Sequence, residues 1–183
     1  MRYIMMKKLI AICLVFMMCL CIFCSCSSRT EGAPDGMKAV ESSDKLDYNI
    51  YIPANWVQDL STGVVSAYVS NSDLSNVSMT QFNLEEMKKL DDYVSYYVKE
   101  LEENLISFTL SEDFPQKMIL DGVEAEKIEY TASLAGNKYK YMQIICINEN
   151  TMYCFTYTAL SENFDTHTEE VQKIIDNFSF KSK

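Results

Sequence analysis

Histidine and basic residues are scarce in this chain of 183 residues. The one histidine, His167, excludes most histidine-rich metal sites and any catalysis that needs several histidines. Sixteen lysine and arginine residues are outnumbered by 26 aspartate and glutamate residues, so the net charge is -10. This charge argues against nucleic-acid binding, which uses cationic side chains to displace counterions from phosphates. The sequence also has no Gly-x-Ser-x-Gly motif, no EF-hand spacing and no internal repeat.

Hydrophobic residues, by contrast, make up 48% of the chain, and aromatic residues make up 12%. This composition supports a packed core and excludes global disorder. The length is that of one domain with a short appendage. The appendage and the domain differ sharply in their hydrophobic pattern.

An export signal is predicted at the N-terminus. Three basic residues precede an apolar run from Leu9 to Cys24, and no acidic residue interrupts them. This arrangement is typical of a signal peptide. The run is shorter than the roughly 20 apolar residues of a comfortable membrane span. An uncleaved signal anchor is the alternative, and it would need this run to cross the bilayer unaided.

The run ends at Phe23-Cys24-Ser25-Cys26, which resembles a bacterial lipoprotein lipobox. In that motif a small residue precedes the cysteine that receives diacylglycerol before cleavage. Cys26 fits best, because Ser25 precedes it and bulky residues precede other cysteines of the run. Phe23 and Cys24 depart from the leucine and the small residue that are usual at their places. The resemblance implies a lipoprotein signal peptide over residues 1–26, lipidation of Cys26, and a location on the extracytoplasmic face of the cell membrane.

Residues 27–43 are mostly serine, glycine, proline and charged residues without an apolar period, which predicts a flexible linker. Without residues 1–26 the chain keeps 13 basic and all 26 acidic residues, which gives a net charge of -13. Anionic lipids repel a body this acidic, so the acyl chains on Cys26 must supply the membrane contact.

The hydrophobic pattern predicts one domain over residues 44–183. Apolar residues at helical spacing run from Leu90 to Leu105 and from Val171 to Phe178. Alternating apolar residues predict short strands, of which the last two are apolar on both faces and therefore central in the sheet. The strands are expected over residues 48–52, 65–69, 76–84, 116–120, 126–132, 138–147 and 152–159.

This order of elements predicts an α+β fold, a three-layer α/β/α sandwich with a mainly antiparallel sheet. The segments 51–56 (YIPANW), 152–159 (MYCFTYTA) and 174–180 (IIDNFSF) resemble PsbP-like domains of the PsbP/Mog/DcrB superfamily, and the resemblance covers roughly residues 44–181. These are packing motifs, so they bear on the fold more than on activity. Known roles in the superfamily are accessory or binding roles, so the resemblance implies neither a cofactor nor catalytic residues.

His167 is expected to play a structural part. The stretch from Thr166 to Glu169 has the pattern of a helix capping box, which places His167 in the first turn of the last helix, in water. A hydrolytic triad would need a nucleophile and an acid beside it. We therefore expect no catalytic role for this side chain.

Cys146 and Cys154 flank one predicted hairpin, and in an exported protein they could form a disulfide bond. A two-residue loop at Glu149-Asn150 would place the two sulfurs on opposite faces of the sheet. A three-residue loop would place them directly opposite each other. The first register gathers more apolar residues on one face, which favours buried free thiols, with the disulfide as the alternative.

Acidic residues and tyrosines are the remaining candidates for binding. Adjacent acids on a helix point in different directions, so we expect a solvated acidic face and no metal site, with weak cation binding as the alternative. The tyrosines are expected at the edge of the core or, alternatively, on a protein or carbohydrate contact surface. Trp56 is expected to fill the core at a strand end. The residues considered are Glu85, Glu86, Asp91, Asp92, Glu102, Glu103, Glu124, Glu126, Glu169, Glu170, Tyr93, Tyr96, Tyr139 and Tyr141.

The sequence as a whole predicts a non-catalytic, membrane-tethered lipoprotein that assists or binds another extracytoplasmic protein. A small-ligand or cation-binding lipoprotein is the first alternative, and an enzyme is the least favoured interpretation. An exposed aromatic patch would indicate an interaction module, and an enclosed pocket with a few aimed polar groups would indicate a ligand binder. Two ionisable groups with displaced pKa values in one cleft would indicate an enzyme.

Overall fold

The computed structural model describes residues 32–41, 46–61, 64–84 and 89–181. The predicted signal peptide, the predicted lipidation site Cys26 and both ends of the predicted linker lie outside these ranges. Within them, no helix combines the length and the hydrophobicity that a bilayer span requires.

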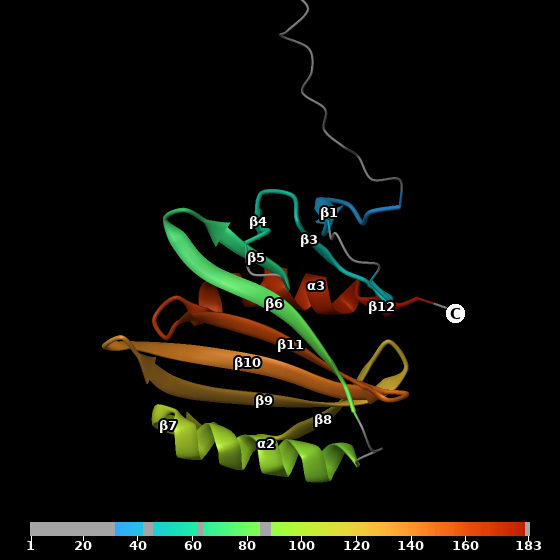
Figure 1. Cartoon of the computed structure of the whole chain (residues 1–183). Coiled ribbons are helices and arrows are strands. Elements are labelled where there is room, and N and C mark those ends of the chain that lie inside the picture. The colour runs from blue at the N-terminus through green and yellow to red at the C-terminus, as the bar shows by residue number, and fades with distance from the viewer. Residues whose placement is uncertain (1–31, 42–45, 62–63, 85–88, 182–183) are drawn as a thin grey trace, which may run out of the picture. The chain divides into compact units, whose positions relative to one another are not determined.

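Most strands belong to one antiparallel sheet with the strand order β4-β5-β6-β11-β10-β9-β7, and β8 also pairs with β9 (Figure 1). Two further pairs, β1 with β3 and β2 with β12, are antiparallel as well. Together with helices α2 and α3, this confirms the predicted α+β class and the mainly antiparallel sheet. The elements are β1 Met37–Ala39, β2 Tyr48–Asn49, β3 Tyr51–Pro53, β4 Val57–Asp59, β5 Val65–Ser70, β6 Asp73–Asn83, α2 Leu90–Asn104, β7 Ile106–Leu110, β8 Gln116–Leu120, β9 Val123–Leu134, β10 Asn137–Asn148, β11 Thr151–Leu160, the 3-10 helix η1 Phe164–His167, α3 Thr168–Asp176 and β12 Ser179–Phe180.

The β10–β11 hairpin has the register that the two-residue loop predicts. Cys146 lies opposite Tyr153, and Ile145 lies opposite Cys154. Because successive side chains of a strand point to opposite faces, the two thiols lie on opposite sides of the sheet. Both are buried and free, so the prediction of free thiols is confirmed and the disulfide alternative is excluded.

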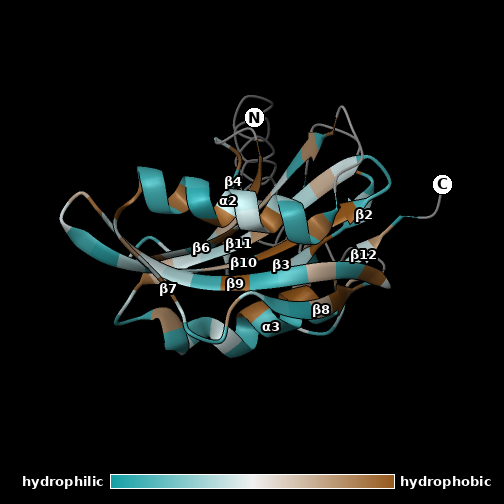
Figure 2. Ribbon diagram, turned by 90° about the horizontal axis from the view of Figure 1, so that it is seen from below, coloured by the Kyte–Doolittle hydropathy of each residue, from teal (hydrophilic) through white to brown (hydrophobic). Residues whose placement is uncertain are grey.

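Helices α2 and α3 pack on opposite sides of the strands (Figures 1 and 2). On one side, α3 contributes Val171, Ile174 and Ile175 to a core that also contains Trp56. On the other side, α2 contributes Val94 to a separate core over β9, β10 and β11. The side chains of β10 and β11 alternate between the two cores, which explains why both strands are apolar on both faces.

The folded region begins before the predicted boundary at residue 44. Strand β1 pairs with β3 and places Met37 opposite Pro53. The Nζ atom of Lys38 donates hydrogen bonds to the backbone carbonyls of Ala54, at 3.1 Å, and Trp56, at 2.6 Å. The prediction of a flexible linker through residue 43 therefore fails at β1, because the partner strand that orders this segment follows it in the chain.

The sequence pattern also does not predict β4, β7 and β12. Each has two to five residues, which is too short for a periodic pattern. They form strands because each hydrogen-bonds to the backbone of a neighbouring strand. Strand β4 pairs with β5, β7 with β9, and β12 with β2.

Candidate functional site

A tight hairpin positions the first half of the candidate site. Asp121 and Gly122 form the two-residue turn between β8 and β9, with φ of 44° and 80°. Glycine adopts such a positive φ without strain, and aspartate tolerates it better than most residues. The turn sets a register in which Lys117 lies opposite Glu126 and Ile119 lies opposite Glu124.

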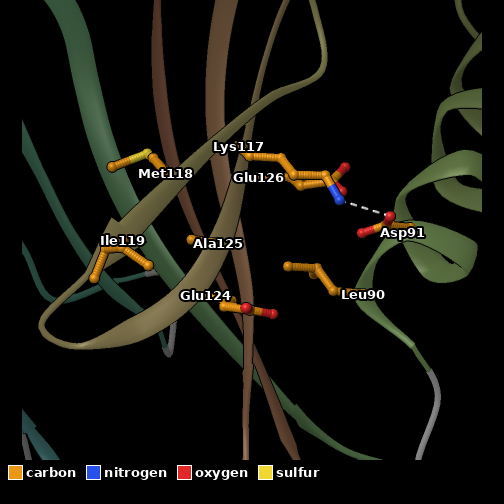
Figure 3. A pocket seen from close by; sticks show the side chains of 8 residues that line it. All are labelled: Leu90, Asp91, Lys117, Met118, Ile119, Glu124, Ala125 and Glu126. Atoms are coloured by element: carbon orange, nitrogen blue, oxygen red, sulfur yellow. Dashed lines mark hydrogen bonds and ion pairs between the residues drawn. The ribbon is translucent and has the colours of Figure 1, made fainter.

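The N-terminus of helix α2 supplies the second half. Leu90 and Asp91, in its first turn, face the β8–β9 hairpin (Figure 3). Helix and hairpin together border a cavity of about 280 Å³, which residues from both elements line. The side chains of Lys117 and Glu126 run side by side toward Asp91 (Figure 3). The complete lining is Leu90, Asp91, Lys117, Met118, Ile119, Glu124, Ala125 and Glu126.

Two carboxyl groups of this cavity have pKa values displaced in opposite directions. Burial raises the pKa of Glu126, which is 5% exposed, and a hydrogen bond to Asp91 raises it further. Lys117 Nζ donates a hydrogen bond to Asp91 Oδ2 at 2.8 Å, and this bond, with that from Glu126, lowers the pKa of Asp91. Of the two carboxyl groups, Glu126 is therefore the one that holds a proton more readily, and Asp91 is the one that ionises more readily.

This arrangement suits the reversible holding of a proton or of another cation. A carboxyl pair that shares one proton carries one negative charge, and a monovalent cation that takes the proton's place leaves the site with the same net charge. The lining contains no serine, threonine, cysteine or histidine. Among the residues that the structure describes, no three acidic, histidine or cysteine side chains converge to hold a metal ion.

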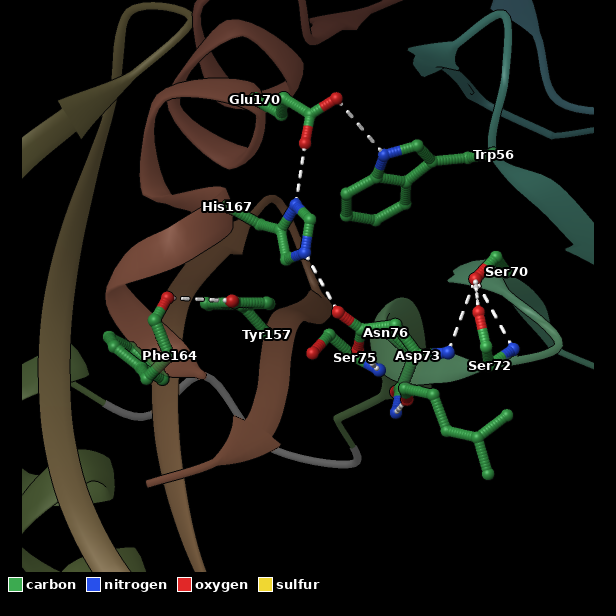
Figure 4. A network of polar contacts seen from close by, with 11 residues as sticks. Trp56, Ser70, Ser72, Asp73, Ser75, Asn76, Tyr157, Phe164, His167 and Glu170 are labelled. Atoms are coloured by element: carbon green, nitrogen blue, oxygen red, sulfur yellow. Dashed lines mark hydrogen bonds and ion pairs between the residues drawn. The ribbon is translucent and has the colours of Figure 1, made fainter. Parts of the chain in front are cut away.

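A second polar cluster surrounds His167 (Figure 4). Its Nδ1 atom lies 2.7 Å from Oε2 of Glu170, and its Nε2 atom lies 3.0 Å from Oδ2 of Asp73. The indole Nε1 of Trp56 donates to the other oxygen of Glu170 at 3.3 Å. The cluster joins β6, α3 and the segment between β3 and β4.

The structure contradicts the expected exposure of His167. Its side chain is only 13% exposed, and the helix α3 begins one residue after it without a side-chain cap, so the predicted capping box does not form. Burial lowers the pKa of the imidazole, but the hydrogen bonds to Glu170 and Asp73 outweigh this and raise it above its usual value. Two carboxylate partners require both ring nitrogens to donate, which is the property of the imidazolium.

Other residues considered from the sequence divide between core and surface. Trp56 is 1% exposed, as predicted. Tyr93 and Tyr97 stack in α2, and Tyr141 stacks on Tyr130 beneath the helix, so most of these rings edge the core as expected. Tyr96, which is 60% exposed, is the exception.

The expectation of a purely solvated acidic face is wrong for Glu126. Glu126 is buried, and it shares a face of β9 with Ile128 and Tyr130, on the side that α2 covers. The burial of Glu126 could therefore have been predicted from the strand pattern, because a carboxyl group that shares a strand face with large apolar residues is expected to be buried with them. The partnership with Asp91 and Lys117 had no such signal, since it depends on where α2 crosses the hairpin.

A second hollow, of about 430 Å³, lies on β4, β5 and β6. Hydroxyl and amide side chains line it together with Val64 and Leu74. Its one carboxylate, Asp59, has a pKa lowered by hydrogen bonds from Ser61. No second acidic or basic side chain belongs to this lining, so the cavity at Glu126 is the stronger candidate.

Solved structures with a similar fold come from several bacteria. PA94, a Pseudomonas aeruginosa protein of unknown function, has 16% identity and a TM-score of 0.59, with 80% of this chain and 99% of that chain covered. LpqN, described as involved in cell envelope biogenesis of Mycobacterium tuberculosis, has 14% identity and a TM-score of 0.57, covering 80% and 91%. CyanoP, the PsbP of Synechocystis sp. PCC 6803, has 16% identity and a TM-score of 0.57, covering 81% and 95%. At such identities the likeness concerns the fold alone.

The comparison with curated proteins gave no match. The family model of DcrB, in contrast, matches residues 49–177, which is more than half of the chain. This match and the fold of CyanoP confirm the PsbP-like domain that the segments 51–56, 152–159 and 174–180 predicted. The chain therefore belongs to the DcrB family.

Proposed function

We propose that the protein is a bacterial lipoprotein, tethered to the extracytoplasmic face of the cell membrane, whose three-layer PsbP-like domain assists or binds another envelope component without catalysing a reaction. The observation that carries the proposal is the apolar run from Leu9 to Cys24 that ends at Ser25-Cys26. The involvement of the fold neighbour LpqN in cell envelope biogenesis supports the same setting.

A non-catalytic role agrees with the surroundings of His167. Both of its ring nitrogens face carboxylates, Asp73 and Glu170, at hydrogen-bonding distance. A histidine that serves as a general base needs one nitrogen free to face a nucleophile or a water molecule. In this cluster the imidazole serves instead to hold β6 against α3.

The tether is tested by metabolic labelling with a radioactive fatty acid in cells that produce the full-length chain. The wild type should carry the label and sediment with membranes, whereas Cys26→Ala should lose the label. Cys24→Ala is the matched control, and it should keep the label because the residue before Cys26 is unchanged. Label that persists in Cys26→Ala would refute the anchor assignment.

The assisting role is tested by crosslinking in intact cells. The tethered wild type should give a defined crosslinked species, and the amount should fall in Cys26→Ala because the untethered domain is diluted. The same low yield from both chains would count against a partner in the envelope.

A second candidate function is the binding of a small ligand or a cation in the cavity between α2 and the β8–β9 hairpin. The observation that favours it is the buried carboxyl group of Glu126, which points into the cavity beside Asp91. Displaced pKa values in one cleft also occur in enzymes. Because the lining has no serine, threonine, cysteine or histidine, binding is the simpler function.

A further inference from the structure

We propose that the cavity between α2 and the β8–β9 hairpin binds a primary alkylammonium group between the carboxyl groups of Asp91 and Glu126. This inference deepens the second candidate function and rests on it, whereas it does not depend on the tether at Cys26. The argument combines the charge of the cavity, the position of Lys117 and the apolar walls.

The charge of the cavity favours a cation over an anion. Three carboxyl groups, those of Asp91, Glu124 and Glu126, line it with one ammonium group, that of Lys117. The chain itself is acidic, with a net charge of -10. A field of this sign raises the local concentration of cations and repels phosphates and carboxylates.

The position of the Lys117 ammonium group indicates where the ammonium group of a ligand can bind. Lys117 Nζ lies 2.8 Å from Asp91 Oδ2, and both side chains are largely exposed, at 74% and 65%. An ion pair this exposed to water contributes little to stability, so Lys117 can leave. A ligand ammonium that replaces it also reaches Glu126, which lies beside Asp91 in the cavity (Figure 3).

The walls of the cavity indicate an organic cation. Leu90 lines it from the helix and Ile119 from the hairpin. The side chains of Met118 and Ala125 point to the other face of the hairpin, into the core on the α3 side. A hydrated metal ion gains nothing from apolar walls, whereas a short alkyl chain is stabilised by burying its methylene groups there. A volume of about 280 Å³ suits a head group with a short chain.

The proton balance of binding is fixed by the shared proton. At a pH at which Glu126 is protonated, the free Asp91–Glu126 pair holds one proton, and the ligand arrives as R-NH3⁺. In the complex both carboxylates accept hydrogen bonds from the ammonium, and the displaced proton passes to the solvent. One proton released per ligand makes the affinity rise about tenfold per pH unit while Glu126 is protonated, and level off above that range.

The test uses the full-length chain in neutral detergent and isothermal titration calorimetry. Cadaverine and Nα-acetyl-lysine amide are the ammonium probes, and 1-pentanol is the uncharged control. Both ammonium probes should bind, with an affinity that rises as the pH increases through the raised pKa of Glu126, and 1-pentanol should not. The tighter of the two probes tells whether a free amine or a peptide lysine is the natural source.

Two variants and a control sharpen the test. Glu126→Gln should weaken cadaverine binding at least about tenfold, because it removes one charged acceptor, and it should abolish the pH dependence. Lys117→Gln should tighten binding about two- to fivefold, because it removes the internal competitor. Glu102→Gln, which changes an exposed residue roughly 16 Å from Asp91 along α2, should change nothing.

Three results would overturn the proposal: no heat with either amine, equal binding to Glu126→Gln, or equal binding of 1-pentanol. Binding of Ca²⁺ in place of the amines would replace it with a metal site. Fatty-acid labelling of Cys26 does not depend on ligand binding in the cavity. Failure of the ammonium proposal can therefore be distinguished from failure of the proposed membrane tether.

Discussion

Oδ2 of Asp73 and Nε2 of His167 lie 3.0 Å apart, although 94 residues separate them in the chain. Asp73 begins strand β6 just after the β5–β6 turn, and His167 directly precedes helix α3. The contact therefore links strand β6 to the start of helix α3, which packs on that side of the sheet. The proximity of Glu170 on the other side of the ring makes the imidazole a bridge between two carboxylates (Figure 4).

Replacing His167 with glutamine should cost more stability in acid than at alkaline pH. The raised pKa of His167 means that its stabilising effect is complete below its unfolded pKa and is lost as the pH rises through the folded value. We expect His167→Gln to lower the free energy of unfolding by about 2 kcal/mol at about pH 5.5, and by less at about pH 8.5. Urea unfolding followed by Trp56 fluorescence measures both values.

Asp73, which contacts His167, sets the lower end of the pH range over which this contact stabilises the fold. It also provides the control for the previous prediction. The pKa of Asp73 is lowered below its ordinary value: burial acts against this, but hydrogen bonds from Ser75 and His167 prevail. Its contribution is therefore present above the unfolded pKa and lost as the pH falls through the folded one. Asp73→Asn should destabilise the wild type but change little in His167→Gln. Additive effects would show that the two residues do not interact.

Trp56 should contribute strongly to stability because it fills the core on the α3 side. It is 1% exposed, and its indole donates to Glu170. Trp56→Phe removes this hydrogen bond and leaves a void, so we expect a loss of about 2–3 kcal/mol in a thermal or urea unfolding experiment. Phe82→Ala is the matched control: the ring is 57% exposed, so the loss should stay below about 0.5 kcal/mol.

Glu126→Gln should stabilise the protein at neutral pH. The pKa of Glu126 is raised by burial and by Asp91, so the folded state loses stability as the pH rises through that pKa. Glutamine carries no charge, and urea unfolding should show a gain of the order of 1 kcal/mol at about pH 7.5 and none at about pH 4. Glu124→Gln, an exposed neighbour on the same hairpin, should change stability at neither pH. A destabilising Glu126→Gln at neutral pH would contradict the assigned environment.

Cys146 and Cys154 should resist alkylation in the native protein. Burial raises the pKa of the Cys146 thiol to about 12 and that of Cys154 to about 11, and the thiolate is the reactive form. Iodoacetamide labelling with peptide mass spectrometry should find both unmodified before unfolding and modified after it. A peptide that links the two cysteines would contradict the register of β10 and β11.

The register of β10 and β11 could be predicted because it depends on the two strands alone. Only a two-residue loop gathers Ile144, Phe155 and Tyr157 on one face, and the structure has this register. The helix stripe from Leu90 to Leu105 was predictable for the same local reason, since its period lies within one segment.

The candidate site was harder to predict because its parts come together only in the tertiary structure. Asp91 meets Lys117 across 26 residues, and His167 meets Asp73 across 94. Charged residues in a sequence indicate exposure on average, and nothing local distinguished Glu126 from Glu124, which lies on the same face of β9 but is exposed next to the turn. Strand β1 was not predicted because its surroundings in the sequence have the composition of a loop.

The unequal burial of the two helices has a consequence for motion. Helix α2 buries one side chain, Val94, completely, whereas the shorter α3 buries three. Segments with less buried apolar contact open at lower free energy. Amide hydrogens of α2 should therefore exchange with solvent deuterium before those of α3, and each such opening lifts Asp91 away from Glu126 while the hairpin beneath stays in the sheet. A ligand bound between these two carboxyl groups would slow that exchange, so the exchange rate of the α2 amides would indicate whether the cavity is occupied.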